Sequence, residues 1–254
     1  MKKKILAITL CVAMLAIMLV SGTLAYFTDE KEQTNTFTAG SLRITLDEVK
    51  VNTTPNADGN LTGLASGERT SEEQTYKLFP GMIVDKDPTI TLVAGSENAY
   101  LASIITVTFD EDADLNVLKK NGLLDENYIL DLDAILDGDY VGELQLNTEH
   151  PLSKNGLTVY GNAAYSVYQK ADSANRTFTF TFYMFFEGAK TAGTAITLFD
   201  TMIIPAGWNN DDMAAVNGMK IHVAAYGAQA VGFEDCYEAM TSAFPTDFPF
   251  AGLE

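Results

Sequence analysis

The chain has 254 residues, with 16 Lys and Arg against 34 Asp and Glu, a formal charge of −18, and an apolar fraction of 47%. This hydrophobic content excludes an acidic disordered tail and predicts a packed core. The negative charge, without a basic patch to offset it, excludes nucleic-acid binding, because phosphates are bound by clustered Lys and Arg.

The first 25 residues have the three parts of a signal peptide. Three lysines precede an uncharged apolar run over Ile5–Val20, which is shorter than the roughly 20 residues that a membrane-spanning helix prefers. Thr23 and Ala25 then supply small side chains at positions −3 and −1 of a cleavage site before Tyr26. We therefore expect a signal helix over residues 1–25 that is cleaved after Ala25. Before cleavage, this helix is expected to be the only part of the chain that contacts the membrane. A retained N-terminal anchor is the alternative.

The cleaved chain begins with a polar arm, which we place at residues 26–36. A single β domain is predicted over residues 37–254. Its first strand is indicated by strict alternation, with Leu42, Ile44 and Leu46 on one face and polar residues on the other. The following stretch, residues 52–75, is rich in Asn, Thr, Gly and acid and predicts a long surface loop.

Further β-rich stretches follow, and short helices interrupt them. We expect a helical insertion near residues 112–138, split near Asn121–Gly122. We also expect a short helix over residues 209–219, capped by an Asn or Asp before Met213, and a terminal helix over 234–244. The β-rich stretches are residues 76–109, 140–147, 157–171, 176–188, 194–208 and 220–233, and the fourth contains a run, Phe182–Phe186, that predicts burial on both faces. The predicted fold class is mainly β, an antiparallel jelly-roll-like β-sandwich with short helical insertions, preceded by the signal helix.

No catalytic constellation is present in the sequence. There are two histidines, and no G-x-S-x-G, H-E-x-x-H or phosphate-binding loop accompanies them. His150 lies in a predicted turn, and His222 lies on the strand face opposite Ile221 and Val223. Both histidines are predicted to be structural, so we expect no catalytic residue, no metal ligand and no enzymatic activity.

The acidic clusters invite a calcium interpretation. Asp110, Asp112 and Asp114 occupy the first, third and fifth positions of an EF-hand loop, but Leu115 replaces the required Gly and Asn121 the bidentate Glu. A solvated acidic face is therefore expected and no cofactor is predicted, with a weak calcium site of another kind as the open alternative.

Cleavage leaves one cysteine, Cys236, which excludes a disulfide framework. A small, semi-buried hydrophobic role is predicted for it, and a reactive thiol is the alternative.

The segment around the cleavage site carries a further pattern. The apolar run ends in small residues and is followed by T-x-A, an aromatic residue, Thr or Asp, and then N-x-F-x-A-G-x-L before the first strand. The residues that match are Thr23, Ala25, Phe27, Thr28, Asp29, Asn35, Phe37, Ala39, Gly40 and Leu42. As a set they resemble the processing region of the TasA/camelysin family, exported proteins of Gram-positive bacteria that are cut by a signal peptidase of the SipW type.

This resemblance implies a secreted protein of the cell surface or extracellular matrix that self-associates into fibres, with the SipW-type peptidase as a processing partner. In that family the segment after the cleavage site can serve as a donor strand for the next subunit, and Tyr26, Phe27 and Phe37 are the candidate anchors here. Camelysin itself is classed as a metallopeptidase. A camelysin-like metallopeptidase and a monomeric surface adhesin or binding module are therefore the alternatives to a fibre subunit.

Overall fold

A computed structural model of the protein describes residues 40–110, 113–126, 130–138, 157–161, 165–172 and 178–250. The predicted signal helix, arm and cleavage site lie outside these residues. The predicted site residues outside them are Thr23, Ala25, Tyr26, Phe27 and Phe37, together with His150.

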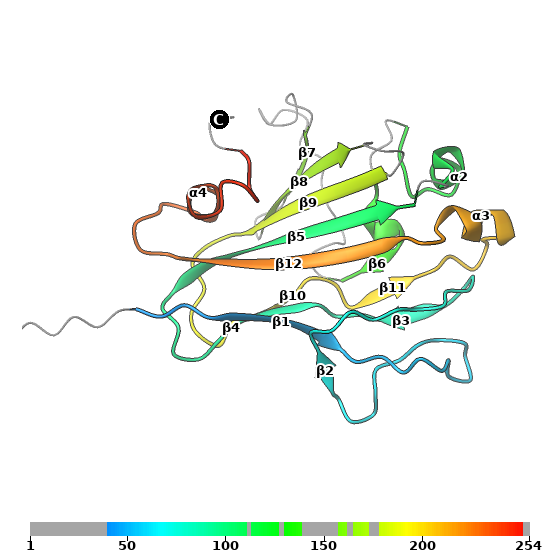
Figure 1. Ribbon diagram of the computed structural model, residues 1–254, viewed down its shortest axis with the longest axis horizontal. Coiled ribbons are helices and arrows are strands. Elements are labelled where there is room, and N and C mark those ends of the chain that lie inside the picture. The colour runs from blue at the N-terminus through cyan, green and yellow to red at the C-terminus, as the bar shows by residue number, and fades with distance from the viewer. Residues whose placement is uncertain are drawn as a thin grey trace, which may run out of the picture. The chain divides into compact units, whose positions relative to one another are not determined.

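The largest sheet has five antiparallel strands (Figure 1). In spatial order they are β12 (Lys220–Gln229), β5 (Ala99–Phe109), β9 (Phe178–Phe186), β8 (Tyr165–Asp172) and β7 (Leu157–Gly161). The long strands β5 and β12 pair over ten residues, from Thr108 opposite Lys220 to Ala99 opposite Gln229.

Two smaller antiparallel sheets lie on one side of the five-stranded sheet (Figure 1). One contains β10 (Ala195–Thr197), β4 (Thr89–Leu92), β1 (Ile44–Val49) and β2 (Arg69–Thr70), and the other contains β3 (Ile83–Asp85), β11 (Thr201–Ile203) and β6 (Leu136–Asp137). Three antiparallel sheets with few helices confirm that the fold is mainly β. The loop predicted over residues 52–75 contains the two-residue strand β2 and is otherwise without long strands or helices.

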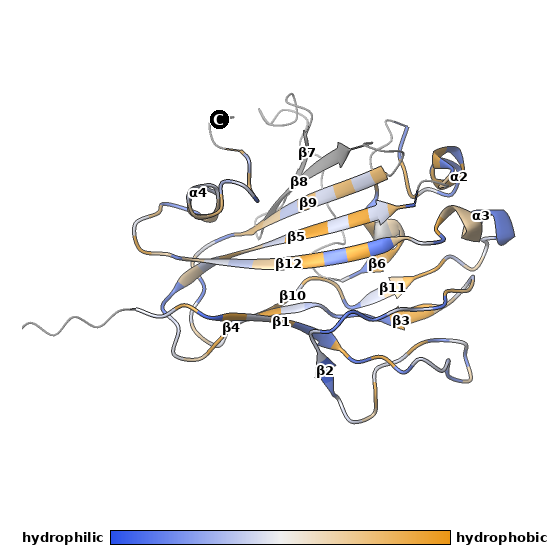
Figure 2. Ribbon diagram, in the orientation of Figure 1, coloured by the Kyte–Doolittle hydropathy of each residue, from blue (hydrophilic) through white to orange (hydrophobic). Residues whose placement is uncertain are grey.

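The main hydrophobic core fills the space between these sheets, because alternate residues of each strand point inward. Ile105 of β5, Phe182 of β9 and Ile90 of β4 are fully buried in it. The opposite face of the five-stranded sheet holds a second cluster, in which Phe185 of β9 lies with Met240. Phe182–Phe186 are thus buried on both faces, as the sequence predicted. Figure 2 shows the apolar residues distributed along β5, β9 and β12.

Four short helical segments complete the described chain. They are α2 (Leu115–Lys120), the 3-10 turn η1 (Leu132–Ala134), α3 (Asn210–Ala215) and α4 (Cys236–Ala243). Helix α2 ends at Lys120 with Asn121 as its C-cap, and Gly122 adopts a positive φ of 78° at the position where the sequence predicts a split. Within the described ranges, no helix has both the length and the apolar character needed to cross a membrane.

One predicted strand is wrong. Residues 194–208 form two short strands, β10 and β11, that belong to different sheets. Leu198 and Phe199 between them are both fully buried, so the alternation of a single strand is broken there. The chain crosses between the sheets at this point, where the Leu198 N–H donates to the Pro88 carbonyl and the Asp200 N–H donates to the Asp137 carbonyl.

Candidate functional site

Strand β12 lies at one edge of the five-stranded sheet and is the candidate functional element. Its partner β5 covers one edge, and just beyond the strand the Ala230 N–H donates to the Asn98 carbonyl at 2.9 Å. The other edge of β12 has no main-chain hydrogen-bond partner among the described residues. The sheet's opposite edge is formed by the five-residue strand β7, so β12 is the longer of the two edges.

The hydrogen-bonding pattern identifies the groups at this edge. Main-chain groups of successive residues in an antiparallel strand point alternately to the two sides. The Ala230 N–H points toward β5, and the Ala224 carbonyl also points there, because it accepts a 3.0 Å hydrogen bond from Ser103 Oγ of β5. The odd-numbered residues therefore direct their main-chain N–H and C=O groups away from β5. We call these groups, on Ile221, Val223, Ala225, Gly227 and Gln229, the open edge.

The side chains of β12 divide between its two faces as the sequence predicted. Ile221, Val223 and Ala225 are half-buried against the main core, while His222 is exposed on the opposite face. An unpaired strand edge of this kind is a template for pairing with another chain, and ten residues span about 33 Å.

Near one end of the open edge, strand β1 packs on the core-facing side of β12. A Cβ atom placed on Gly227 would lie 3.1 Å from Cγ2 of Ile44, so the absence of a side chain at Gly227 is what allows the close approach of β1. The described chain also begins at this end, because the Glu97 N–H, in the turn before β5, donates to the Ser41 carbonyl at 2.9 Å.

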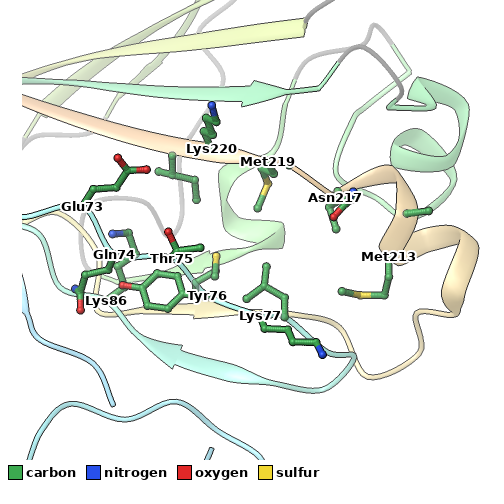
Figure 3. A pocket seen from close by; sticks show the side chains of 16 residues that line it. Glu73, Gln74, Thr75, Tyr76, Lys77, Lys86, Met213, Asn217, Met219 and Lys220 are labelled. Carbon is green, nitrogen blue, oxygen red and sulfur yellow. The ribbon is translucent and has the colours of Figure 1, made fainter. Parts of the chain in front are cut away.

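The other end of the open edge borders a cleft of about 770 Å³ (Figure 3). One side of the cleft is the coil Glu73–Leu78, and the other is the turn Val216–Met219 with the first residues of β12. Met202 of β11 also lines the cleft. The cleft is thus bordered by the first residues of the open edge of β12 and by the coil Glu73–Leu78.

The coil over residues 71–78 makes no main-chain to main-chain hydrogen bond within the described part of the chain. The side chain of Gln74 holds it instead. Its Nε2 donates to the Val49 carbonyl at 2.9 Å and to Glu48 at 2.8 Å, and its Oε1 accepts from the Val51 N–H at 2.8 Å. The Gln74 amide therefore bonds main-chain groups of Val49 and Val51 at the end of β1, which a neighbouring strand would otherwise bond. The main chain of the coil takes no part in this contact.

A buried polar group lies beneath the coil. Lys86 forms an ion pair with Glu48, and both side chains are only 12% exposed. The Lys86 ammonium lies 5.9 Å from the centre of the Tyr76 ring, and the Tyr76 hydroxyl is buried without a hydrogen-bond partner in the described chain. Burial, and secondarily the charge of Glu48, raises the pKa of Tyr76 above its usual range. The hydroxyl is therefore neutral, and it lies buried beside Lys86 beneath the coil.

Helix α3 positions the turn on the other side of the cleft. Asn209 caps the helix by accepting from the Asp211 and Asp212 N–H groups, and Asp212 accepts in return from the Asn209 N–H at 2.9 Å. The prediction of a capped helix before Met213 is confirmed. The hydrogen bond from the Asn209 main chain, with smaller contributions from Asn121 and Lys120, lowers the pKa of the buried Asp212.

The residues considered for metal chemistry are not brought together within the described chain, where no group of three or more His, Cys, Asp or Glu side chains is arranged to hold a metal ion. Asp114 serves as the N-cap of α2, accepting from the Asn116 N–H at 2.9 Å, and Asp112 lies outside the described residues.

The structural prediction for Cys236 is confirmed. The residue is buried at the start of α4, and its thiol donates to the Leu101 carbonyl at 3.1 Å. Burial raises the pKa of the Cys236 thiol to about 12, which keeps it protonated and unreactive.

Comparison with known families bears on the N-terminal part of the chain. Residues 1–59 match the family model described as camelysin metallo-endopeptidase. The resemblance to the TasA/camelysin family is confirmed. Proteins of the TasA/camelysin family are generally exported or surface-associated. The match ends in the loop after β1, so β12 and the cleft lie outside it, and no curated protein and no solved structure matches the chain.

Sequence reasoning identified β12 as a strand but missed that it forms an edge beside a cleft. Alternation of Ile221, Val223 and Ala225 reveals one buried face but does not reveal which strands pair. The role of Gln74 was also missed, since nothing in a polar loop distinguishes one glutamine from its neighbours. The sequence did contain one signal that β12 is not a central strand. The strand includes the small residues Ala224, Ala225 and Gly227, which are unusual in the centre of a sheet.

Proposed function

We propose that the protein is a secreted, non-catalytic subunit of cell-surface or biofilm-matrix fibres. After cleavage behind Ala25, the arm at residues 26–36 of one copy pairs with the open edge of β12 in the next copy. The jelly-roll-type sandwich that the family resemblance implies is part of this proposal. The observation that carries it is the ten-residue strand β12, whose open edge has no partner among the described residues and leads into the cleft.

The chemistry of the open edge supports pairing with an extended chain. A donor strand gains affinity from main-chain hydrogen bonds and specificity from pockets for alternate side chains. The open edge supplies the first of these, and the cleft of about 770 Å³ supplies room for aromatic side chains such as Tyr26 and Phe27. The coil over residues 73–78, on the facing side, also makes no main-chain to main-chain hydrogen bond within the described residues.

The position of the chain's own start supports assembly between copies. The described chain begins beside Glu97, at the end of β12 that Ile44 contacts, whereas the cleft lies at the opposite end. The described start of the chain is therefore separated from its own cleft by the length of β12. A contact between two different surfaces of identical subunits is heterologous, and such contacts build open filaments when the rotation does not close into a ring.

The first test is electron microscopy of mature protein whose N-terminus has been verified as Tyr26. We expect filaments for the mature protein and dispersed particles for a variant that lacks residues 26–36. Filaments of unchanged yield from the trimmed variant would refute the donor-strand proposal. Dispersed particles from the mature protein at every concentration would favour the monomeric adhesin instead.

The second test is a pair of proline substitutions in β12. Ala225→Pro removes an N–H that points away from β5, and proline is tolerated at such positions of edge strands. We expect Ala225→Pro to retain the circular dichroism spectrum of the folded protein and to lose filaments. Ala224→Pro removes an N–H that points toward β5, so this control should unfold the domain. A folded Ala225→Pro variant that still forms filaments would contradict pairing at this edge.

The family description also names a metallo-endopeptidase, and this activity needs its own test. A protease assay of the mature protein with and without a chelator separates the two functions, and we expect no chelator-sensitive cleavage. A chelator-sensitive activity that disappears in the variants His150→Ala and His222→Ala would replace the fibre-subunit proposal with a catalytic one.

A further inference from the structure

We infer that Lys77 and Lys220, at the rim of the cleft, guide the acidic segment Asp29–Glu32 of the arm from a second copy into that cleft. This inference rests on the proposed function and adds to it the groups that select and orient the arriving arm. It assigns to the two lysines a role in the rate of assembly.

The distribution of positive charge is the first observation. The chain has 16 Lys and Arg among 254 residues, yet the lining of this one cleft contains three lysines and one glutamate, namely Lys77, Lys86, Lys220 and Glu73. Lys86 is committed to its buried ion pair with Glu48. Because Glu48 neutralises Lys86, Lys77 and Lys220 outnumber Glu73 by one charge in the lining, on a protein that is strongly negative.

The other two lysines are exposed, and neither forms an ion pair within the described chain. Lys77 belongs to the coil and Lys220 is the first residue of β12, so they flank the cleft from its two sides (Figure 3). The Lys77 ammonium lies 5.4 Å from the centre of the exposed Phe79 ring, and the Lys77 side chain is itself exposed at the rim.

The sequence of the arm complements these charges. Residues 26–36 contain Asp29, Glu30 and Glu32 against one lysine, Lys31. Two copies of a strongly acidic chain repel one another, so productive encounter requires a local attraction. Charges at the rim of a contact act mainly on the association rate by steering the encounter, and they contribute less to the final affinity. Acids in the arm and lysines at the rim meet this requirement.

The experiment follows filament elongation from preformed seeds of mature protein. In the double variant Lys77→Glu with Lys220→Glu, we expect the elongation rate to fall about tenfold at 0.1 M salt, because steering is replaced by repulsion. The matched control, Lys50→Glu with Lys190→Glu, makes the same change in net charge at two lysines outside the cleft lining, and it should elongate close to the wild-type rate.

A charge swap provides the decisive comparison. Monomers with the arm changes Asp29→Lys and Glu30→Lys should elongate poorly on wild-type seeds and recover on seeds that carry Lys77→Glu and Lys220→Glu. All four substituted side chains are polar, and thermal denaturation of each variant verifies the fold of the domain.

The results also separate this inference from the proposal on which it rests. Unchanged elongation of the Lys77 and Lys220 variant, equal slowing of the control, or no recovery in the swap would each overturn the guiding role. If at the same time removal of residues 26–36 still abolishes filaments, the donor-strand function stands. Filaments from the trimmed protein would overturn both.

Discussion

Strands β5 and β12 are neighbours of similar length in one sheet, and they differ in almost every other respect. β5 is paired on both edges, with β9 and β12, and nearly all of its residues are buried. β12 is paired on one edge, and most of its residues are only partly buried. The difference fits a division of roles in the proposed function, in which β5 stabilises the domain and β12 is the strand proposed to offer main-chain groups to another chain.

The largest expected effect comes from truncating a core residue of β5. Ile105 is fully buried, so Ile105→Ala should lower the free energy of unfolding by about 3 kcal/mol through lost burial and the cavity left behind. Val223 of β12 is half-buried, and Val223→Ala should cost about 1 kcal/mol. Urea denaturation of the two variants measures this contrast. Equal losses would show that β12 contributes to the core as β5 does.

A smaller effect is expected at the helix that supports the cleft end of β12. Asn209→Ala removes the cap of α3 and should destabilise the domain by about 1 kcal/mol. Because α3 leads into the turn that borders the cleft, filament elongation should also slow. Asp211→Ala, on the exposed side of the same first turn, is the control, and we expect less than about 0.5 kcal/mol from it.

The same helix adds a dependence on pH. The pKa of Asp212 is lowered in the folded state, so its stabilising contribution is present above the ordinary value of 3.8 and is lost as the pH falls through the folded-state pKa. The urea midpoint of the wild type should therefore fall more steeply below about pH 4 than that of Asp212→Asn. Identical pH profiles for the two proteins would contradict the assigned role of Asp212.

The smallest effects on stability concern two side chains on the outer face of the same sheet, one buried and one exposed. Cys236 contacts β5 and its thiol has a pKa of about 12, so thiol reagents should modify it only after unfolding. His222 is exposed on β12, so acylating reagents should modify it in the native protein. Mass spectrometry of digested, modified protein tests both. His222→Ala should change stability by less than about 0.5 kcal/mol.

The sequence predicted the local elements that rest on local chemistry. Alternating residues such as Phe180 and Phe182 defined β9, and Asn209 defined the start of α3. Such signals depend only on residues that are close together in the chain, so they can be recognised in a single sequence. The prediction of a single strand over residues 194–208 was wrong because the chain crosses between two sheets there. The crossing is marked by two successive buried residues, Leu198 and Phe199, and a periodic pattern does not reveal it.

The candidate site depends on distant pairings, and for that reason the sequence did not reveal it. That β12 is an edge follows from which strands lie beside it, and no local pattern encodes this order. The cleft requires the coil near Tyr76 to face a turn near Asn217, far away in the chain. The acids of the arm were visible from the start, but their possible partners Lys77 and Lys220 became a pair only in three dimensions.

The pairing of β5 with β12 also has a consequence for how the chain folds. Ser103 and Ala224 are bonded to one another across 121 positions of sequence. Contacts this distant must wait until nearly the whole chain is available, and proteins dominated by them fold in milliseconds to seconds instead of microseconds. Strand β5 of the largest sheet lacks one of its two neighbours until the last strand, β12, is available. A chain with this order of strands completes its largest sheet only once β12, close to the C-terminal end of the described residues, is available.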